Sequence, residues 1–164
     1  MMPFLALSLG LAAAVVTDVR TRRIPNWLTG AIVGAGFGLA FGGGGVTPLQ
    51  AALGVLLGLI LMLPGHLIGA TGAGDVKLMA AVGSFLGPSL VFRAFLYSAL
   101  AGGVLALAVA IRRGLLADTM LGTTRLVTSP AATRDAIVTP GRRNRFAYGP
   151  AIAAGTLITL LVQP

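Results

Sequence analysis

Apolar runs separated by charged residues, prolines and glycines dominate the pattern along the chain. The six runs are Met2–Thr17, Trp27–Phe41, Leu49–Gly69, Val76–Gly87, Leu90–Ile111 and Ala147–Val162. A helix that crosses a membrane needs about 17–25 predominantly apolar residues. The second, fourth and sixth runs are shorter, so we expect them to include polar flanks or to lie in a tilted, locally thinned bundle. The pattern predicts an all-α polytopic membrane protein with six transmembrane helices.

The composition also indicates a lipid environment. Of the 164 residues, 56% are hydrophobic and 10% are charged, whereas a soluble domain carries about 25% charged residues. This balance excludes soluble enzymes, disulfide-rich secreted domains and disordered tails. The chain has no cysteine, and its single histidine, His66, cannot form a multi-histidine metal site within one chain. We therefore expect no cofactor and no metal.

The distribution of basic residues predicts how the chain is oriented in the membrane. The net charge is +8, and all 12 Lys and Arg residues except Arg93 lie in or beside alternate connections between the runs. By the positive-inside rule these connections are cytoplasmic, both termini lie outside, and residues of about 112–146 form one large cytoplasmic loop. No aromatic residues are interleaved with the basic ones, so we expect lipid headgroups and no nucleic acid as their partner. Residues 1–164 are expected to form a single integral-membrane domain.

Glycines recur at four-residue spacing in two of the predicted helices. The two series are Gly30, Gly34, Gly38 and Gly42, and then Gly54 and Gly58. Small residues at this spacing lie on one helix face and let transmembrane helices approach closely. We therefore predict that both series are packing faces.

Two of the four aspartates lie where apolar runs meet the predicted cytoplasmic face. Asp18 directly follows the first run, and Asp75 lies between the third and fourth runs. An ionisable side chain at membrane depth is costly and indicates a functional site. Gly72 and Gly74, beside Asp75, leave backbone uncovered, which allows an extended substrate segment to approach the carboxylate.

A pair of carboxylates at one site is typical of aspartic-protease chemistry. Both cannot ionise readily, so the pair holds one proton near neutrality. The ionised member takes a proton from attacking water, and the protonated member stabilises the oxyanion. The structural alternative is that Asp18 pairs with Arg22, and Asp75 with Lys77, as ion pairs at headgroup level. For Lys77, adjustment of Asp75 ionisation and anchoring to headgroups are both open.

Three ordered blocks of residues carry a family resemblance. They are Asp18 with Arg20 and Ile24-Pro25-Asn26, then Gly72-x-Gly74-Asp75-x-Lys77-Leu78, and finally Tyr148-Gly149-Pro150-Ala151-Ile152. Together they resemble the type IV prepilin peptidases, and more narrowly the short, peptidase-only branch that serves tight-adherence (Flp-type) pili. The likeness extends over nearly the full chain.

The resemblance implies a GxGD-type aspartic endopeptidase of the bacterial inner membrane, with Asp18 and Asp75 as its catalytic pair. The implied substrates are prepilins and pseudopilins, cut at the cytoplasmic face after a short basic leader that ends in glycine. Larger relatives carry an additional cytoplasmic domain with a four-cysteine zinc site and also methylate the new terminus. Because this chain has no cysteine and only the short Arg20–Trp27 connection, we expect no methylation. The lipid bilayer is the other expected partner, and a homo-oligomer is left open.

Two other function classes are weighed against the peptidase. A small transporter or channel would use Asp18 and Asp75 to bind a cation or relay protons, and it predicts carboxylates near the bilayer midplane. A structural subunit of a secretion complex would use the glycine faces and the basic loop, and would need neither aspartate.

Among the remaining motif residues, Asn26 is expected to cap the second helix. Tyr148 is expected to line the site or to anchor the chain at the interface.

Overall fold

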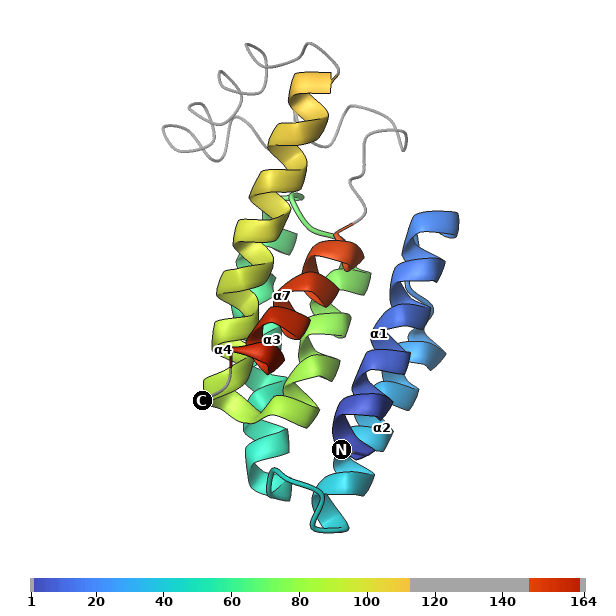
Figure 1. The fold of residues 1–164 in the computed structure, drawn as a ribbon, viewed down its shortest axis with the longest axis vertical. Helices are drawn as coiled ribbons and strands as arrows, with labels where there is room; N and C mark the ends of the chain where they lie inside the picture. The colour runs from blue at the N-terminus through green and yellow to red at the C-terminus, as the bar shows by residue number, and fades with distance from the viewer. Residues whose placement is uncertain (1, 113–147, 163–164) are drawn as a thin grey trace.

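The computed structural model describes residues 2–112 and 148–162, drawn in colour in Figure 1. These residues form the helices α1 (Met2–Thr21), α2 (Asn26–Phe41), α3 (Pro48–Leu67), α4 (Ala73–Arg112) and α7 (Gly149–Leu161). Within the described ranges there is no β-strand, which confirms the all-α prediction. Apart from Arg112, the predicted cytoplasmic loop of about 112–146 lies outside the described residues.

Helix α4 turns back on itself at Gly87. This glycine has φ 69° and ψ −179°, which is not helical, and Pro88 follows it. Glycine tolerates a positive φ that strains other residues, and proline has no backbone N–H to continue the helical ladder. The two halves of α4 consequently run in opposite directions, green and then yellow in Figure 1. The break lies at the predicted boundary between the fourth and fifth apolar runs.

The described helices are suited to a membrane. Three segments are long and apolar enough to cross a membrane, namely Pro3–Thr21, Pro48–Leu67 and Ala73–Val109. The last of these includes the turn at Gly87. Helices α2 and α7 are apolar but shorter. Large hydrophobic side chains are exposed on the outer faces of all the described helices. Such surfaces require lipid or another apolar partner, so the chain is a membrane protein. The number of spans and the orientation of the termini stay predictions.

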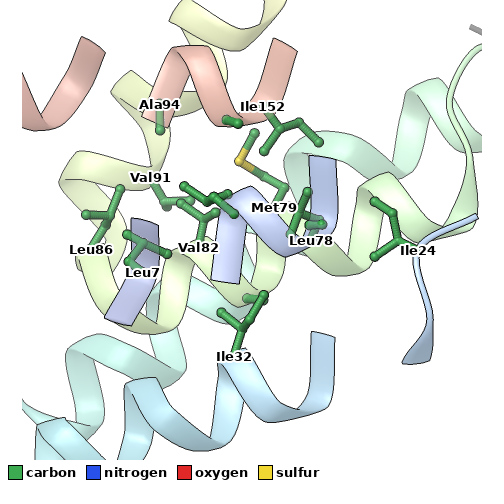
Figure 2. Packing of buried hydrophobic residues seen from close by; sticks show 14 of the residues in the cluster. Leu7, Ile24, Ile32, Leu78, Met79, Val82, Leu86, Val91, Ala94 and Ile152 are labelled. Carbon is green, nitrogen blue, oxygen red and sulfur yellow. The ribbon is translucent and has the colours of Figure 1, made fainter. Parts of the chain in front are cut away.

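The first half of α4 forms the centre of the bundle. From Val76 to Gly87 its residues are buried, except for the exposed Lys77 and the partly buried Phe85. Figure 2 shows side chains of the other helices gathered around it, among them Leu7 of α1 and Ile152 of α7. A helix that is apolar on all sides is expected in such a position. Asp75, in the first turn of α4, therefore lies at one end of the core.

Glycines bring the backbones of α3 and α4 into contact. An added Cβ at Gly54 would overlap the backbone of Gly83, and one at Gly58 would lie 2.7 Å from the carbonyl oxygen of Met79. Only glycine permits such an approach. The packing prediction is confirmed for this series.

The other glycine series, on α2, faces away from the described helices. A Cβ at Gly30, Gly34 or Gly38 would meet nothing within 4 Å among the described residues. Helix α2 instead approaches α4 at Gly36, where a Cβ would overlap Ser84. The packing prediction is therefore wrong for this series within the described chain. The buried residues of α2 also recur every four positions, but they are shifted by two positions from the glycine series. They are Leu28, Ile32, Gly36 and Ala40.

We expect Gly54→Ala to destabilise the protein, because the added methyl group would overlap the backbone of α4. Overpacking of this kind costs about 1–3 kcal/mol. Gly34→Ala is the matched control, since it gains the same helix propensity while its methyl group meets no described residue. Thermal unfolding in one detergent should give a lower Tm for Gly54→Ala than for the unchanged protein, and no decrease for Gly34→Ala. Equal Tm values for the two variants would contradict the close α3–α4 contact.

Candidate active site

Ends of three helices distant in sequence meet in one region. They are the last turn of α1, the first turn of α4 and the first turn of α7, all away from the end of the bundle that holds the N-terminus in Figure 1. Asp18 lies in the last turn of α1, and Asp75 lies in the first turn of α4. Each aspartate is only 6% exposed. A carboxylate buried to this extent requires hydrogen-bond donors.

Asp18 receives its donor from the beginning of α7. Its Oδ2 accepts a hydrogen bond from the backbone N–H of Gly149 at 2.9 Å, across 131 residues of sequence. Gly149 is the first residue of α7, where backbone amides lack helical partners and the helix dipole is positive. A Cβ at Gly149 would lie 2.7 Å from Asp18 Oδ2. Glycine is therefore required for this contact.

Asp75 is held by the residues that begin its own helix. Its Oδ2 accepts from the backbone N–H of Gly72 at 3.0 Å. Asp75 is the third residue of α4 and reaches back to the residue before the helix, as the third residue does in a capping box. A Cβ at Gly72 would lie 3.1 Å from Asp75 Oδ2. Gly72 thus provides both a donor and room for the carboxylate.

The two carboxylates belong to one electrostatic environment. The charge of Asp18 acts on Asp75, and the charge of Asp75 acts on Tyr148, the residue before Gly149. Each carboxylate uses Oδ2 for its amide contact, and within the described chain no hydrogen bond reaches either Oδ1.

Tyr148 fixes the start of α7 against the second half of α4. Its hydroxyl donates to the carbonyl oxygen of Ser98 at 3.2 Å, and an added Cβ at Gly102 would overlap its ring. Since Tyr148 directly precedes Gly149, it anchors the amide that binds Asp18.

Gly74 and Lys77 face the connection between α1 and α2. A Cβ at Gly74 would lie 3.2 Å from the Cβ of Ile24. The Lys77 ammonium donates to Asn26 Oδ1 at 2.8 Å. The expectation that Asn26 caps α2 is wrong, because the N-cap residue is Pro25 and no side chain caps the helix. The amide oxygen of Asn26 is used by Lys77 instead.

The role of Gly149 is the part of the site that the sequence motifs did not predict. Its signal is the proline beside it, since Pro150 near the start of an apolar run marks a helix N-terminus. Helix N-termini favour carboxylates, and the chain has only four acidic residues to supply one. Within residues 2–112 and 148–162, no group of three or more His, Asp or Glu side chains could hold a metal ion. The described site is one of carboxylates, amides and a phenol.

A model of the type IV leader peptidase family matches residues 5–107, well over half of the chain. The chain belongs to this family. The match includes Asp18 and Asp75, whereas α7 lies beyond it. No curated protein and no solved structure matches the chain. Membership favours a peptidase over the transporter and the structural subunit considered from the sequence.

We expect Gly149→Ala to lower the peptidase activity of the protein. The added methyl group would displace the Asp18 carboxylate, and a misplacement of about 1 Å at a reacting group can cost about 100-fold in rate. Gly103→Ala is the matched control, because a Cβ there meets nothing within 4 Å among the described residues. The rate of leader-peptide cleavage by the two purified variants checks the expectation. Full activity of Gly149→Ala would show that the Asp18–Gly149 contact is dispensable.

Proposed function

We propose that the protein is a GxGD-type aspartic endopeptidase with Asp18 and Asp75 as its catalytic pair. The proposed substrates are Flp-type prepilins and pseudopilins, which lose a short basic leader. The observation that carries the proposal is the convergence of two buried carboxylates at ends of three helices. Membership of the leader peptidase family supports the same reaction class.

In the proposed reaction the pair of carboxyl groups holds one proton. The ionised member takes a proton from water while the water oxygen bonds to the carbonyl carbon of the scissile peptide. The other member gives its proton to the carbonyl oxygen, which yields a tetrahedral diol. The first carboxyl then protonates the amide nitrogen, the C–N bond breaks, and the diol returns a proton to the pair. The products are a carboxyl group on the leader and an amine on the pilin.

The amide contacts give this reaction a fixed geometry. Oδ2 of Asp18 is bound to Gly149 N–H, and Oδ2 of Asp75 is bound to Gly72 N–H, so each carboxyl group is held at one of its oxygens. The remaining oxygens are then available to the water and to the peptide carbonyl. Fixed positioning of reacting groups supplies a large part of the rate enhancement of enzymes.

We further propose that the site faces the cytoplasm from the inner membrane. Basic residues belong to the connections and helix ends on the side of the two aspartates, whereas Arg93 lies just beyond the turn that reverses α4. Positive residues are retained on the cytoplasmic side of a membrane. The described basic residues on the side of the aspartates are Arg20, Arg22, Arg23, Lys77 and Arg112.

We expect either Asp18→Asn or Asp75→Asn to abolish leader cleavage, because a shared-proton mechanism needs both carboxyl groups. An asparagine keeps an oxygen for the amide contact but cannot take a proton from water. Cleavage of a prepilin by purified variants in detergent measures the effect, with Asp118→Asn, in the predicted loop, as the active control. Near-normal turnover by either site variant would remove that aspartate from the mechanism.

Cleavage should also be insensitive to chelators and to thiol reagents. The chain has no cysteine to modify, and the proposed reaction uses carboxyl groups alone. Activity of the purified protein with and without EDTA or N-ethylmaleimide checks this. Inhibition by EDTA that added zinc reverses would contradict the proposed mechanism.

A further inference from the structure

The connection between α1 and α2 lies against the first turn of α4. Ile24 is buried, and it packs so closely on Gly74 that an added Cβ would lie 3.2 Å from the Ile24 Cβ and 3.5 Å from the Ile24 backbone nitrogen. Any larger residue at position 74 would push this connection away. Gly74 therefore sets the distance between the end of α1 and the start of α4.

A second contact joins the start of α4 to Asn26, the residue that begins α2 directly after this connection. Lys77 Nζ donates to Asn26 Oδ1 at 2.8 Å, across 51 residues of sequence. Lys77 follows Gly74 by three positions, so both lie on one face of α4. Asp75, two positions before Lys77, points to a different face and is buried while Lys77 is exposed. Lys77 is thus directed at the connection and away from the carboxylate.

We infer that Lys77 and Asn26 are positioning residues, whose contact holds the end of α1 that carries Asp18 beside the start of α4 that carries Asp75. The inference rests on the proposed function. In this role the Lys77 ammonium neither transfers a proton nor pairs with the Asp75 carboxylate. It fixes the separation of the two aspartates from outside the site.

The hydrogen bonds of the two aspartates do not themselves connect α1 to α4. Asp18 is tied to α7 and Asp75 to its own helix. Among the described residues, neither of these hydrogen bonds joins α1 to α4. The Asn26–Lys77 hydrogen bond and the Ile24–Gly74 packing join the segment that follows α1 to the first turn of α4, in addition to the direct packing of α1 on α4 in the core. Loss of the hydrogen bond leaves apolar packing and the Asp18–Gly149 contact to hold the two carboxylates in register.

Removal of either partner should slow cleavage without changing the catalytic groups. For Lys77→Met and Asn26→Leu we expect kcat for a reporter prepilin to fall about 10- to 100-fold, with a smaller change in KM. The double variant should be no slower than the slower single variant, because both changes remove one contact. Asn26→Asp, which keeps the acceptor oxygen, should retain activity.

Arg23→Met is the matched control for loss of a positive charge in the same region. Arg23 is exposed, and its backbone carbonyl accepts a hydrogen bond from Thr21 Oγ1. This variant should cleave normally. The inference would be overturned if Arg23→Met lost as much activity as Lys77→Met. It would also be overturned if the activity losses of the Asn26 and Lys77 variants multiplied in the double variant.

A distance measurement tests the inference without relying on activity. The chain has no cysteine, so Val19→Cys on α1 and Ala73→Cys on α4, both exposed, accept spin labels without background. We expect one narrow distance distribution with the contact intact, and a longer or broader one in Lys77→Met. An unchanged distribution in Lys77→Met, whatever its activity, would refute a positioning role.

The same labels separate this inference from the proposed function. Asp18→Asn should keep the narrow distribution while losing cleavage, because it leaves the Asn26–Lys77 contact in place. Normal cleavage by Asp18→Asn would refute the proposed catalytic pair. The label distances would then still report whether Lys77 holds the two helix ends together.

Discussion

A carboxylate removed from water requires a hydrogen-bond donor, and in this bundle each buried aspartate finds it at the beginning of a helix. Gly72 N–H serves Asp75, and Gly149 N–H serves Asp18. Both donors are glycines, because a side chain at either position would crowd the carboxylate it binds. The arrangement of the helices meets this requirement. Helices α4 and α7 begin in the region where α1 ends, so that unpartnered amides face the two acidic groups.

The reversal of α4 at Gly87 lets one helix support both halves of the site. Its first half begins with Asp75 and passes through the core. Its second half returns beside α7, where the carbonyl oxygen of Ser98 accepts the Tyr148 hydroxyl and Gly102 leaves space for the ring. The amide that binds Asp18 is therefore anchored to the same helix that carries Asp75. A straight helix could not reach both carboxylates.

Much of this architecture could be predicted from the sequence because lipid imposes long apolar runs on the helices that contact it. Boundaries differ where polar residues continue a helix, as in α1, which extends past its apolar run through Asp18 to Thr21. The packing face of α2 was not predicted because two sets of small or apolar residues on this helix share the four-residue spacing. One set contains Gly34 and the other contains Gly36, and the spacing alone does not show which set faces the bundle. The aspartates could be identified as site candidates from their rarity and position. The Asp18–Gly149 contact joins residues 131 apart, and no local pattern reports such a pairing.

The helices around the site are short. Helix α7 has 13 residues and α2 has 16, which correspond to about 20 and 24 Å of length, and the first half of α4 measures about 22 Å. The hydrocarbon core of a typical bilayer is about 30 Å thick, and mismatch is relieved by tilting helices or compressing lipid. Longer acyl chains would tilt the longer α1 and α3 differently from their short neighbours, and would shift the depth of Asp18 relative to Asp75. We therefore expect acyl-chain length to influence how the two aspartates lie relative to each other, so that bilayer thickness bears on the geometry of the candidate site.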